Sequence, residues 1–228
     1  MIYLTGDTHG TIEIGKLSAT NLAKAGVDPQ EGDYVVILGD FGLIWSDPPD
    51  NAERWWLKWL DKKPWTTLFI DGNHENFARL NALPEEEWHG GRVHRVSEKV
   101  LHLMRGQVFE IEGRSFFTMG GAASHDRQFR KEGRSWWPEE LPSEDELARA
   151  DAALDARGRR IDYVLTHCAP TLVQGRINPT FLPDILTEYL QHVRDTTAFG
   201  RWYFGHYHVD REYDDGFIAL YNCVVPIE

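Results

Sequence analysis

An aspartate and a histidine two residues apart are suited to binding a transition metal. Asp7 and His9 lie between Gly6 and Gly10, directly after a short apolar run at residues 1–5. Carboxylate oxygen and imidazole nitrogen are ligands for Zn, Mn, Fe or Co, and the glycines allow the backbone to turn so that both side chains face one point. This motif alone is a weak signal, because aspartate is also common in turns.

Further polar motifs follow apolar runs in the same way. They are Gly39-Asp40, Gly72-Asn73-His74-Glu75, Gly120-Gly121, Thr166-His167 and Gly205-His206-Tyr207-His208. Four of the ten histidines, two aspartates and one asparagine therefore occur where strands are expected to end. Independent core residues have no reason to share this placement, so we interpret these seven residues as a metal cluster. Four further histidines match no motif and are expected to be ordinary core or surface residues, namely His89, His94, His102 and His192.

The spacing of these motifs is typical of strand-helix-strand units. The same interval separates Asp7 from Asp40 and Asp40 from Asn73. The elements expected from the apolar pattern are strands at 1–5, 33–38 and 65–70, with helices at 14–25 and 50–61. Since ligands bind beyond the carboxyl ends of neighbouring parallel strands, these three side chains should lie at one edge of a sheet.

The middle third is expected to form a mostly antiparallel second sheet. Its strands are expected at 93–96, 99–103, 107–111 and 115–119. A polar segment at 120–142 is long enough to be a functional loop or lid, and Ser143 is expected to start a helix that ends near Arg157. In the last third of the chain, the apolar runs predict strands that end at His167 and His206, followed by a closing hairpin arm at 217–225.

Length and composition favour one α/β domain that spans residues 1–228. Apolar residues make up 42% of the chain and charged residues 26%, as in globular proteins. We find neither a signal-peptide pattern nor a run of the roughly 20 apolar residues needed to cross a membrane, so we expect a soluble, cytoplasmic protein. The net charge of −12 disfavours binding to long nucleic acids. It still permits a phosphate substrate, because bound cations make a pocket locally positive.

The ordered motifs resemble those of the calcineurin-like metallophosphoesterase superfamily, from residue 6 to residue 208. The resemblance implies a four-layer α/β/β/α sandwich of two mixed β-sheets flanked by helices. It also implies a hydrolase of phosphate esters that binds two divalent metal ions. The implied ligands are Asp7, His9, Asp40 and His208 for one ion, and Asp40, Asn73, His167 and His206 for the other. Asp40 would bridge the two ions.

This division of ligands is chemically reasonable. Two cations about 3.5 to 4 Å apart can hold a bridging hydroxide that attacks phosphorus in line. Asp40 suits the bridge because a carboxylate has two oxygens, whereas Asn73 contributes a neutral oxygen. His74 is not needed as a ligand. By the resemblance and by its titration range, we expect His74 to protonate the leaving-group oxygen or to stabilise its charge. The ligand types do not distinguish Mn, Fe and Zn.

The second motif departs from that of many phosphoprotein phosphatases in this superfamily, which read Gly-Asp-x-x-Asp-Arg-Gly. Here residues 39–45 read Gly-Asp-Phe-Gly-Leu-Ile-Trp, without the second aspartate or the arginine that grips phosphate. We expect a replacement in the 120–142 segment, with Arg127 as the first candidate for binding phosphate. The further candidates for substrate binding are Arg130, His125 and Asp126. Ion pairs within the loop are an equal alternative for Arg130 and Arg134.

The departure favours a small phosphorylated molecule or nucleotide as substrate, and it leaves the choice between monoester and diester open. The alternatives are a nuclease or phosphodiesterase acting on DNA or RNA, a phosphoprotein phosphatase and, least favoured, a non-catalytic scaffold. Trp45, Trp136 and Trp137 lie in loops near the expected metal edge. They could stack on a base or an aromatic leaving group, although we prefer to interpret them as packing residues.

Overall fold

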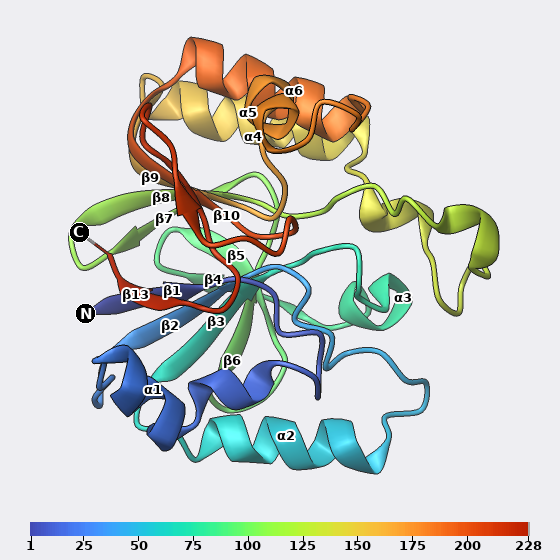
Figure 1. The fold of residues 1–228 in the computed structure, drawn as a ribbon, viewed down its shortest axis with the longest axis vertical. Coiled ribbons are helices and arrows are strands. Elements are labelled where there is room, and N and C mark those ends of the chain that lie inside the picture. The colour runs from blue at the N-terminus through green and yellow to red at the C-terminus, as the bar shows by residue number, and fades with distance from the viewer. Residues whose placement is uncertain (228) are drawn as a thin grey trace.

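Within residues 1–227, which this computed structural model describes, the apolar runs form two mixed β-sheets (Figure 1). The strands of the first sheet are β1 (Ile2–Thr5), β2 (Tyr34–Leu38), β3 (Thr66–Ile70), β4 (Glu85–Trp88), β5 (Gly91–Arg95), β6 (Val100–Leu103) and β13 (Val224–Pro226). Their order is β13-β1-β2-β3-β6-β5-β4. The strands of the second sheet are β7 (Gln107–Ile111), β8 (Arg114–Met119), β9 (Arg160–Thr166), β10 (Ala198–Phe204), β11 (Arg211–Glu212) and β12 (Phe217–Ala219). Their order is β11-β12-β10-β9-β8-β7.

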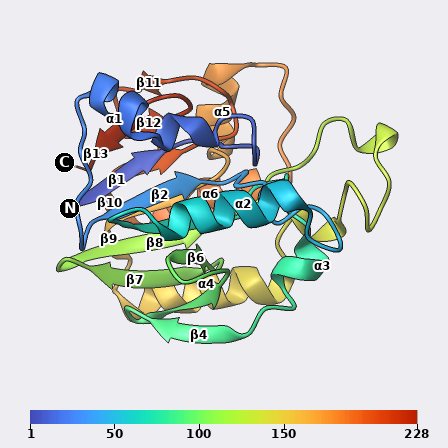
Figure 2. The same ribbon diagram turned by 90° about the horizontal axis from the view of Figure 1, so that it is seen from below.

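Helices cover the outer face of each sheet (Figures 1 and 2). The first sheet is covered by the 3-10 helix η1 (Ile14–Leu17) with α1 (Ala19–Ala25) and α2 (Asn51–Asp61), and the second by α4 (Glu144–Ala156), α5 (Thr171–Ile177) and α6 (Ile185–Thr196). The short helices α3 (Phe77–Leu80), η2 (Arg127–Phe129) and η3 (Pro138–Glu140) lie in connections. The inner faces share a core that includes Leu38 and Ile70 of one sheet and Phe116 and Leu165 of the other. The four-layer α/β/β/α sandwich is therefore confirmed.

Parallel pairing brings the polar motifs to one edge. β1, β2 and β3 are neighbours, with Thr5 opposite Ile37 and Leu38 opposite Ile70. In the second sheet β9 and β10 are also parallel, and Thr166 lies opposite Phe204. The carboxyl ends of these strands precede the loops that carry the predicted ligands. The expected placement at the strand ends is confirmed.

The prediction that the middle third forms one second sheet is wrong, although its neighbouring strands do pair in antiparallel fashion, β5 with β6 and β7 with β8. β6 pairs in parallel with β3, and β5 and β4 extend the first sheet in antiparallel fashion. Of the described strands in the middle third, β7 and β8 alone belong to the second sheet, where β8 is parallel to β9. The predicted hairpin arm at 217–225 is confirmed only for β12, which pairs in antiparallel fashion with β11 and in parallel with β10, whereas β13 crosses to pair with β1. A local pattern identifies a strand, but its partner depends on which apolar faces meet in the folded chain.

The helices differ from prediction in two respects. The expected helix at 14–25 is interrupted at Ser18, whose hydroxyl accepts a hydrogen bond from the backbone of Asn21 and caps α1. α5 and α6 were not predicted, whereas α4 begins as expected with a capping box between Ser143 and Glu146. Within the described part of the chain, every helix is too short or too polar to cross a membrane.

Candidate metal centre

Loops after five strands bring the predicted ligands together. The ligand atoms of Asp7, His9 and His208 lie within 4.8 Å of one another, and the same holds for the group of Asp7, Asp40 and His167. Asn73 joins this second group, since its Oδ1 is 3.3 Å from His167 Nε2. The two remaining polar neighbours are His206, whose ring centroid is 5.0 Å from that of His167, and His74, which lies within 4.8 Å of His9 and Asp40. All seven predicted ligand positions therefore surround one small volume.

The backbone in these loops is bent into unusual conformations. His9, Asp40, His206 and His208 have φ angles of 41°, 46°, 65° and 51°. Non-glycine residues seldom adopt positive φ, and such residues gather at functional sites, where the surrounding contacts hold them. Gly72 is required for a different reason, because a Cβ there would lie 2.0 Å from Asp40 Oδ1. The sequence motifs thus supply tight turns as well as ligand atoms.

The donor atoms fit a divalent metal site. Asp7 Oδ2 is buried and accepts no hydrogen bond among the described residues, although His208 Nε2 lies 3.1 Å from it. His167 Nδ1 donates to the carbonyl oxygen of Leu38 at 2.8 Å, so Nε2, which lies 3.3 Å from both Asp40 Oδ1 and Asn73 Oδ1, is the ring nitrogen that a metal would bind after losing its proton. A histidine that binds a metal normally donates its other N–H to an oxygen in this way. Buried carboxylate and imidazole groups that converge on one volume are stabilised by a cation among them.

His9 is oriented by a residue that the sequence reasoning missed. His9 Nδ1 is 3.0 Å from Glu13 Oε2, and His9 Nε2 is 3.3 Å from Asp40 Oδ2. The Glu13 carboxylate therefore accepts the Nδ1 proton and directs Nε2 into the cluster. The signal in the sequence was a carboxylate four residues after a ligand histidine.

The electrostatics of the cluster attract positive charge. Burial opposes the charged form of His167, but the carboxylates of Asp40 and Asp7 outweigh it and raise the pKa of His167 to about 10. Burial, together with the neighbouring His167, lowers the pKa of His206 to about 3, so its imidazole is neutral and able to bind a metal. A divalent cation is attracted by the same carboxylates that retain the His167 proton. Metal binding should therefore release that proton.

Asp40 is held by the loop that carries Asn73. The backbone N–H of His74 donates to Asp40 Oδ1 at 2.8 Å, and the backbone N–H of Phe41 donates to Glu75 Oε1 at 2.8 Å. Glu75 is fully buried. Its pKa is raised chiefly by this burial, and the negative charges of Asp40 and Asp71 add to the effect. The Gly-Asn-His-Glu motif thus fixes the preceding Gly-Asp motif through hydrogen bonds in addition to carrying the predicted ligand Asn73.

His74 lines a hollow of about 250 Å³ together with five of the predicted metal ligands, which are His9, Asp40, Asn73, His206 and His208. Its Nε2 is 3.3 Å from Arg130 Nη2, and its ring centroid is 6.0 Å from that of Trp45. Burial lowers the pKa of His74, and the charge of Arg130 adds to this effect against the attraction of Asp40. His74 is therefore placed to exchange a proton with a group bound in the hollow.

The substrate-binding candidates are separated by the structure. Arg130, His125 and Asp126 line the hollow, and Arg130 Nε also pairs with Asp126 Oδ1 at 2.7 Å. Arg127 is not among the lining residues, because its guanidinium lies over the ring of Trp136, 5.1 Å from the centroid. Arg130 is thus better placed than Arg127 to contact a phosphate, although both lie in the same predicted loop. Arg130 therefore forms an ion pair with Asp126 within the loop and also lines the hollow.

A buried ion pair connects the metal loop to the 120–142 segment. Asp71, directly before Gly72, accepts hydrogen bonds from Arg105 Nε at 2.8 Å and Nη2 at 2.5 Å. Arg105 also donates to the carbonyl oxygen of Glu139 at 2.8 Å, and Asp71 Oδ1 is 3.1 Å from His102 Nε2. Burial opposes the charged carboxylate, but Arg105 and His102 together outweigh burial and lower the pKa of Asp71. Sequence reasoning missed this pair, since neither residue belongs to a ligand motif.

Comparison with known proteins agrees with this geometry. A family model described as calcineurin-like phosphoesterase matches residues 1–210, a range that includes every predicted ligand from Asp7 to His208. Comparison with curated proteins found no match.

Proposed function

The chain belongs to the calcineurin-like phosphoesterase family, and from this we propose that it hydrolyses small phosphate esters at a centre of two divalent cations. Metal-dependent hydrolysis of phosphate esters is the activity that the family implies. The observation that carries the proposal is the convergence of buried carboxylate and imidazole groups, in which Asp7 Oδ2 lacks a hydrogen bond. The substrate, the use of two ions and their identity as Mn, Fe or Zn belong to the proposal.

The ligand residues have distinct roles in this proposal. Asp7, His9 and His208 would hold one cation, and Asn73, His167 and His206 the other. Asp40 lies between the two groups, with Oδ2 3.3 Å from His9 Nε2 and Oδ1 3.3 Å from His167 Nε2, and would bridge them. The cations would supply Lewis acidity at phosphorus and activate the attacking water.

Residues beside the ligands would handle the rest of the reaction. Arg130 would bind a phosphate oxygen, since a guanidinium matches the geometry of two phosphate oxygens. His74 would protonate the leaving-group oxygen or stabilise its charge as the ester bond to phosphorus breaks. A small substrate is favoured because the second motif lacks the aspartate and arginine of phosphoprotein phosphatases. The net charge of −12 also disfavours long nucleic acids.

The test is hydrolysis of chromogenic phosphate monoesters and diesters by metal-stripped protein, with Mn, Fe or Zn added back. We expect turnover that depends on the metal and is lost in Asp40→Ala. The preferred ester would identify the substrate class. Bound metal without turnover of either ester would reject the proposal and favour the scaffold alternative.

A further inference from the structure

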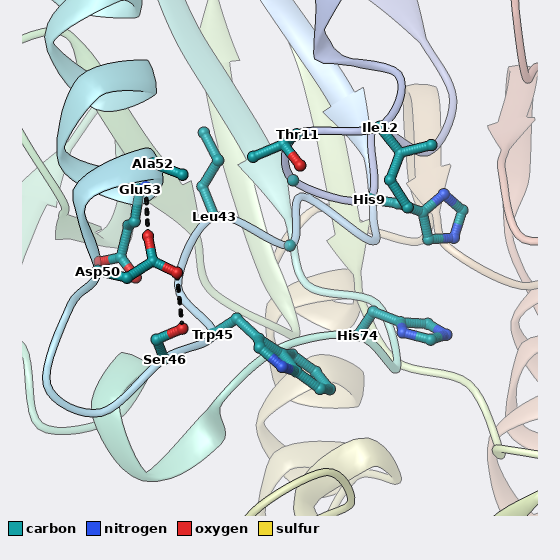
Figure 3. Close-up of a pocket in the computed structure, with 12 residues that line it drawn as sticks. His9, Thr11, Ile12, Leu43, Trp45, Ser46, Asp50, Ala52, Glu53 and His74 are labelled. Carbon is teal, nitrogen blue, oxygen red and sulfur yellow. Dashed lines mark hydrogen bonds between the residues drawn. The ribbon is translucent and has the colours of Figure 1, made fainter.

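A second hollow opens beside the metal centre, on the His74 side (Figure 3). Its volume is about 330 Å³, within the range of small-molecule sites. It shares His9 and His74 with the metal-centre hollow. A molecule whose phosphate lies among the metal ligands can therefore extend past His74 into this second hollow, which we call the side hollow.

The walls of the side hollow are largely apolar. Leu43 and Trp45 come from the loop after β2, and Ile12 comes from the loop after β1 (Figure 3). The Trp45 ring is inclined by 28° to that of His74, and the buried Trp137 packs against it edge to face, with centroids 5.7 Å apart. Ile12 is 75% exposed. A supported indole and an exposed aliphatic side chain along one hollow suit the two faces of a flat apolar group.

The far end of the side hollow carries negative charge. Asp50 accepts hydrogen bonds from Glu53 N at 2.8 Å and from Ser46 Oγ at 3.0 Å, and it lies at the opposite end from the two histidines (Figure 3). Glu53 is paired with Arg79 at 2.6 Å, whereas no lysine or arginine is among the described residues that line the side hollow. An anion that entered would therefore meet the Asp50 carboxylate, because the two arginines that interact with Asp50, Arg54 and Arg79, are not among the residues that line the side hollow.

We propose that the side hollow binds the leaving group of the phosphate ester and selects a planar ring without negative charge. This inference rests on the proposed phosphoesterase function. During hydrolysis, the water oxygen forms the new bond to phosphorus as the ester P–O bond breaks, and the leaving-group oxygen takes up a proton through His74, which regains one from the attacking water. The oxygen of the leaving alcohol lies where the two hollows meet, and the ring of the alcohol lies over Trp45.

The first test compares benzyl phosphate with cyclohexylmethyl phosphate, which has a ring of similar size that is not planar. Both esters release a primary alcohol, so the chemistry of the leaving oxygen is matched. We expect a higher kcat/KM for the benzyl ester, and we expect Trp45→Leu to lower the ratio of the two values about 2- to 10-fold, as for loss of an aromatic contact. The control is Trp55→Leu, because Trp55 is 57% exposed on α2 and should not affect the ratio. If Trp45 only positions His74, both esters slow equally and the proposal is overturned.

The second test concerns charge. Benzyl phosphate is compared with its 4-carboxy derivative in wild type and in Asp50→Asn, since asparagine retains the helix cap of α2 without the charge. We expect the wild type to discriminate against the carboxylate. The substitution should raise the relative kcat/KM for the carboxylate about two- to fivefold at low salt. An unchanged ratio would reject the role of Asp50.

A binding measurement separates failure of this inference from failure of the proposed function. Calorimetric titration of the metal-loaded protein with benzylphosphonate and cyclohexylmethylphosphonate requires no turnover. Tighter binding of the benzyl compound, weakened by Trp45→Leu, would support the side hollow even if every ester resisted hydrolysis. Hydrolysis of esters together with equal binding of the two phosphonates would overturn the side hollow alone.

Discussion

Replacing Arg105 with methionine tests how strongly the buried ion pair supports the metal loop. Asp71 and Arg105 are 1% and 5% exposed, and two hydrogen bonds join them at 2.8 and 2.5 Å. Methionine can fill much of the space of the arginine stem but cannot compensate the Asp71 carboxylate. The substitution also removes the hydrogen bond from Arg105 to the carbonyl oxygen of Glu139. The variant therefore leaves a charge uncompensated in the core.

The magnitude follows from the burial of both partners. Removing one member of a buried ion pair costs about 3–5 kcal/mol, because the remaining charge loses both solvent and partner. In a chain of this size each kcal/mol lowers the melting temperature by about 2–4 °C, so Arg105→Met should lower it by about 6–20 °C. The matched control is Arg95→Met. Its pair with Glu86 is 41% and 38% exposed, and loss of a surface pair costs about 0–1 kcal/mol.

The assay is urea unfolding followed by circular dichroism, with scanning calorimetry for the melting temperature. The double variant Asp71→Asn with Arg105→Met should recover part of the lost stability, since it removes both charges. A loss below about 1 kcal/mol in Arg105→Met would refute the reasoning. The same holds if the double variant were no more stable than the Arg105 single variant.

Three other predictions concern the site and its surroundings. His74→Asn should retain both metal ions by elemental analysis but lower kcat about 10²- to 10⁴-fold, because the proton donor is lost; unchanged turnover would exclude the proposed role. Arg130→Met should raise KM or lower kcat/KM for small phosphate esters, whereas Arg127→Met should leave steady-state kinetics near wild type. The reverse result would show that Arg127, and not Arg130, binds the phosphate in solution. Burial and the neighbouring His102 lower the pKa of His94 to about 4. Its contribution to stability is therefore complete above pH 6.5 and is lost as the pH falls towards 4, because the unfolded chain binds the extra proton. His94→Asn should reduce the change in unfolding free energy between pH 6.5 and pH 4 by about 1–2 kcal/mol. An unchanged pH profile would contradict the attribution of this pH dependence to His94.

The ligand positions could be predicted because they depend on local order. Asp7, Asp40 and Asn73 each follow a buried parallel strand, and parallel strands with right-handed helical connections end at one edge. The glycines before Asp40 and Asn73 report the tight turns that place these side chains. Such features are encoded within a few residues of each motif, so the sequence predicts them without knowledge of the packing.

Other features depend on contacts between distant segments. Arg127 and Arg130 have the same chemistry and lie three residues apart, and only the folded loop shows that Arg127 lies over Trp136 while Arg130 reaches His74. The pair of Asp71 with Arg105 likewise joins separate parts of the chain, as does the support of Trp45 by Trp137.

The amino-acid sequence by itself thus predicted a metal cluster and the strands that carry it, and its resemblance to a known family predicted the four-layer class of the fold. The tertiary structure decided which sheet β6 and β13 join, which arginine faces the metal centre and where the side hollow lies. The physical reason is that periodicity and turn residues act over a few neighbours, whereas pairing and side-chain direction are selected by the burial of whole faces.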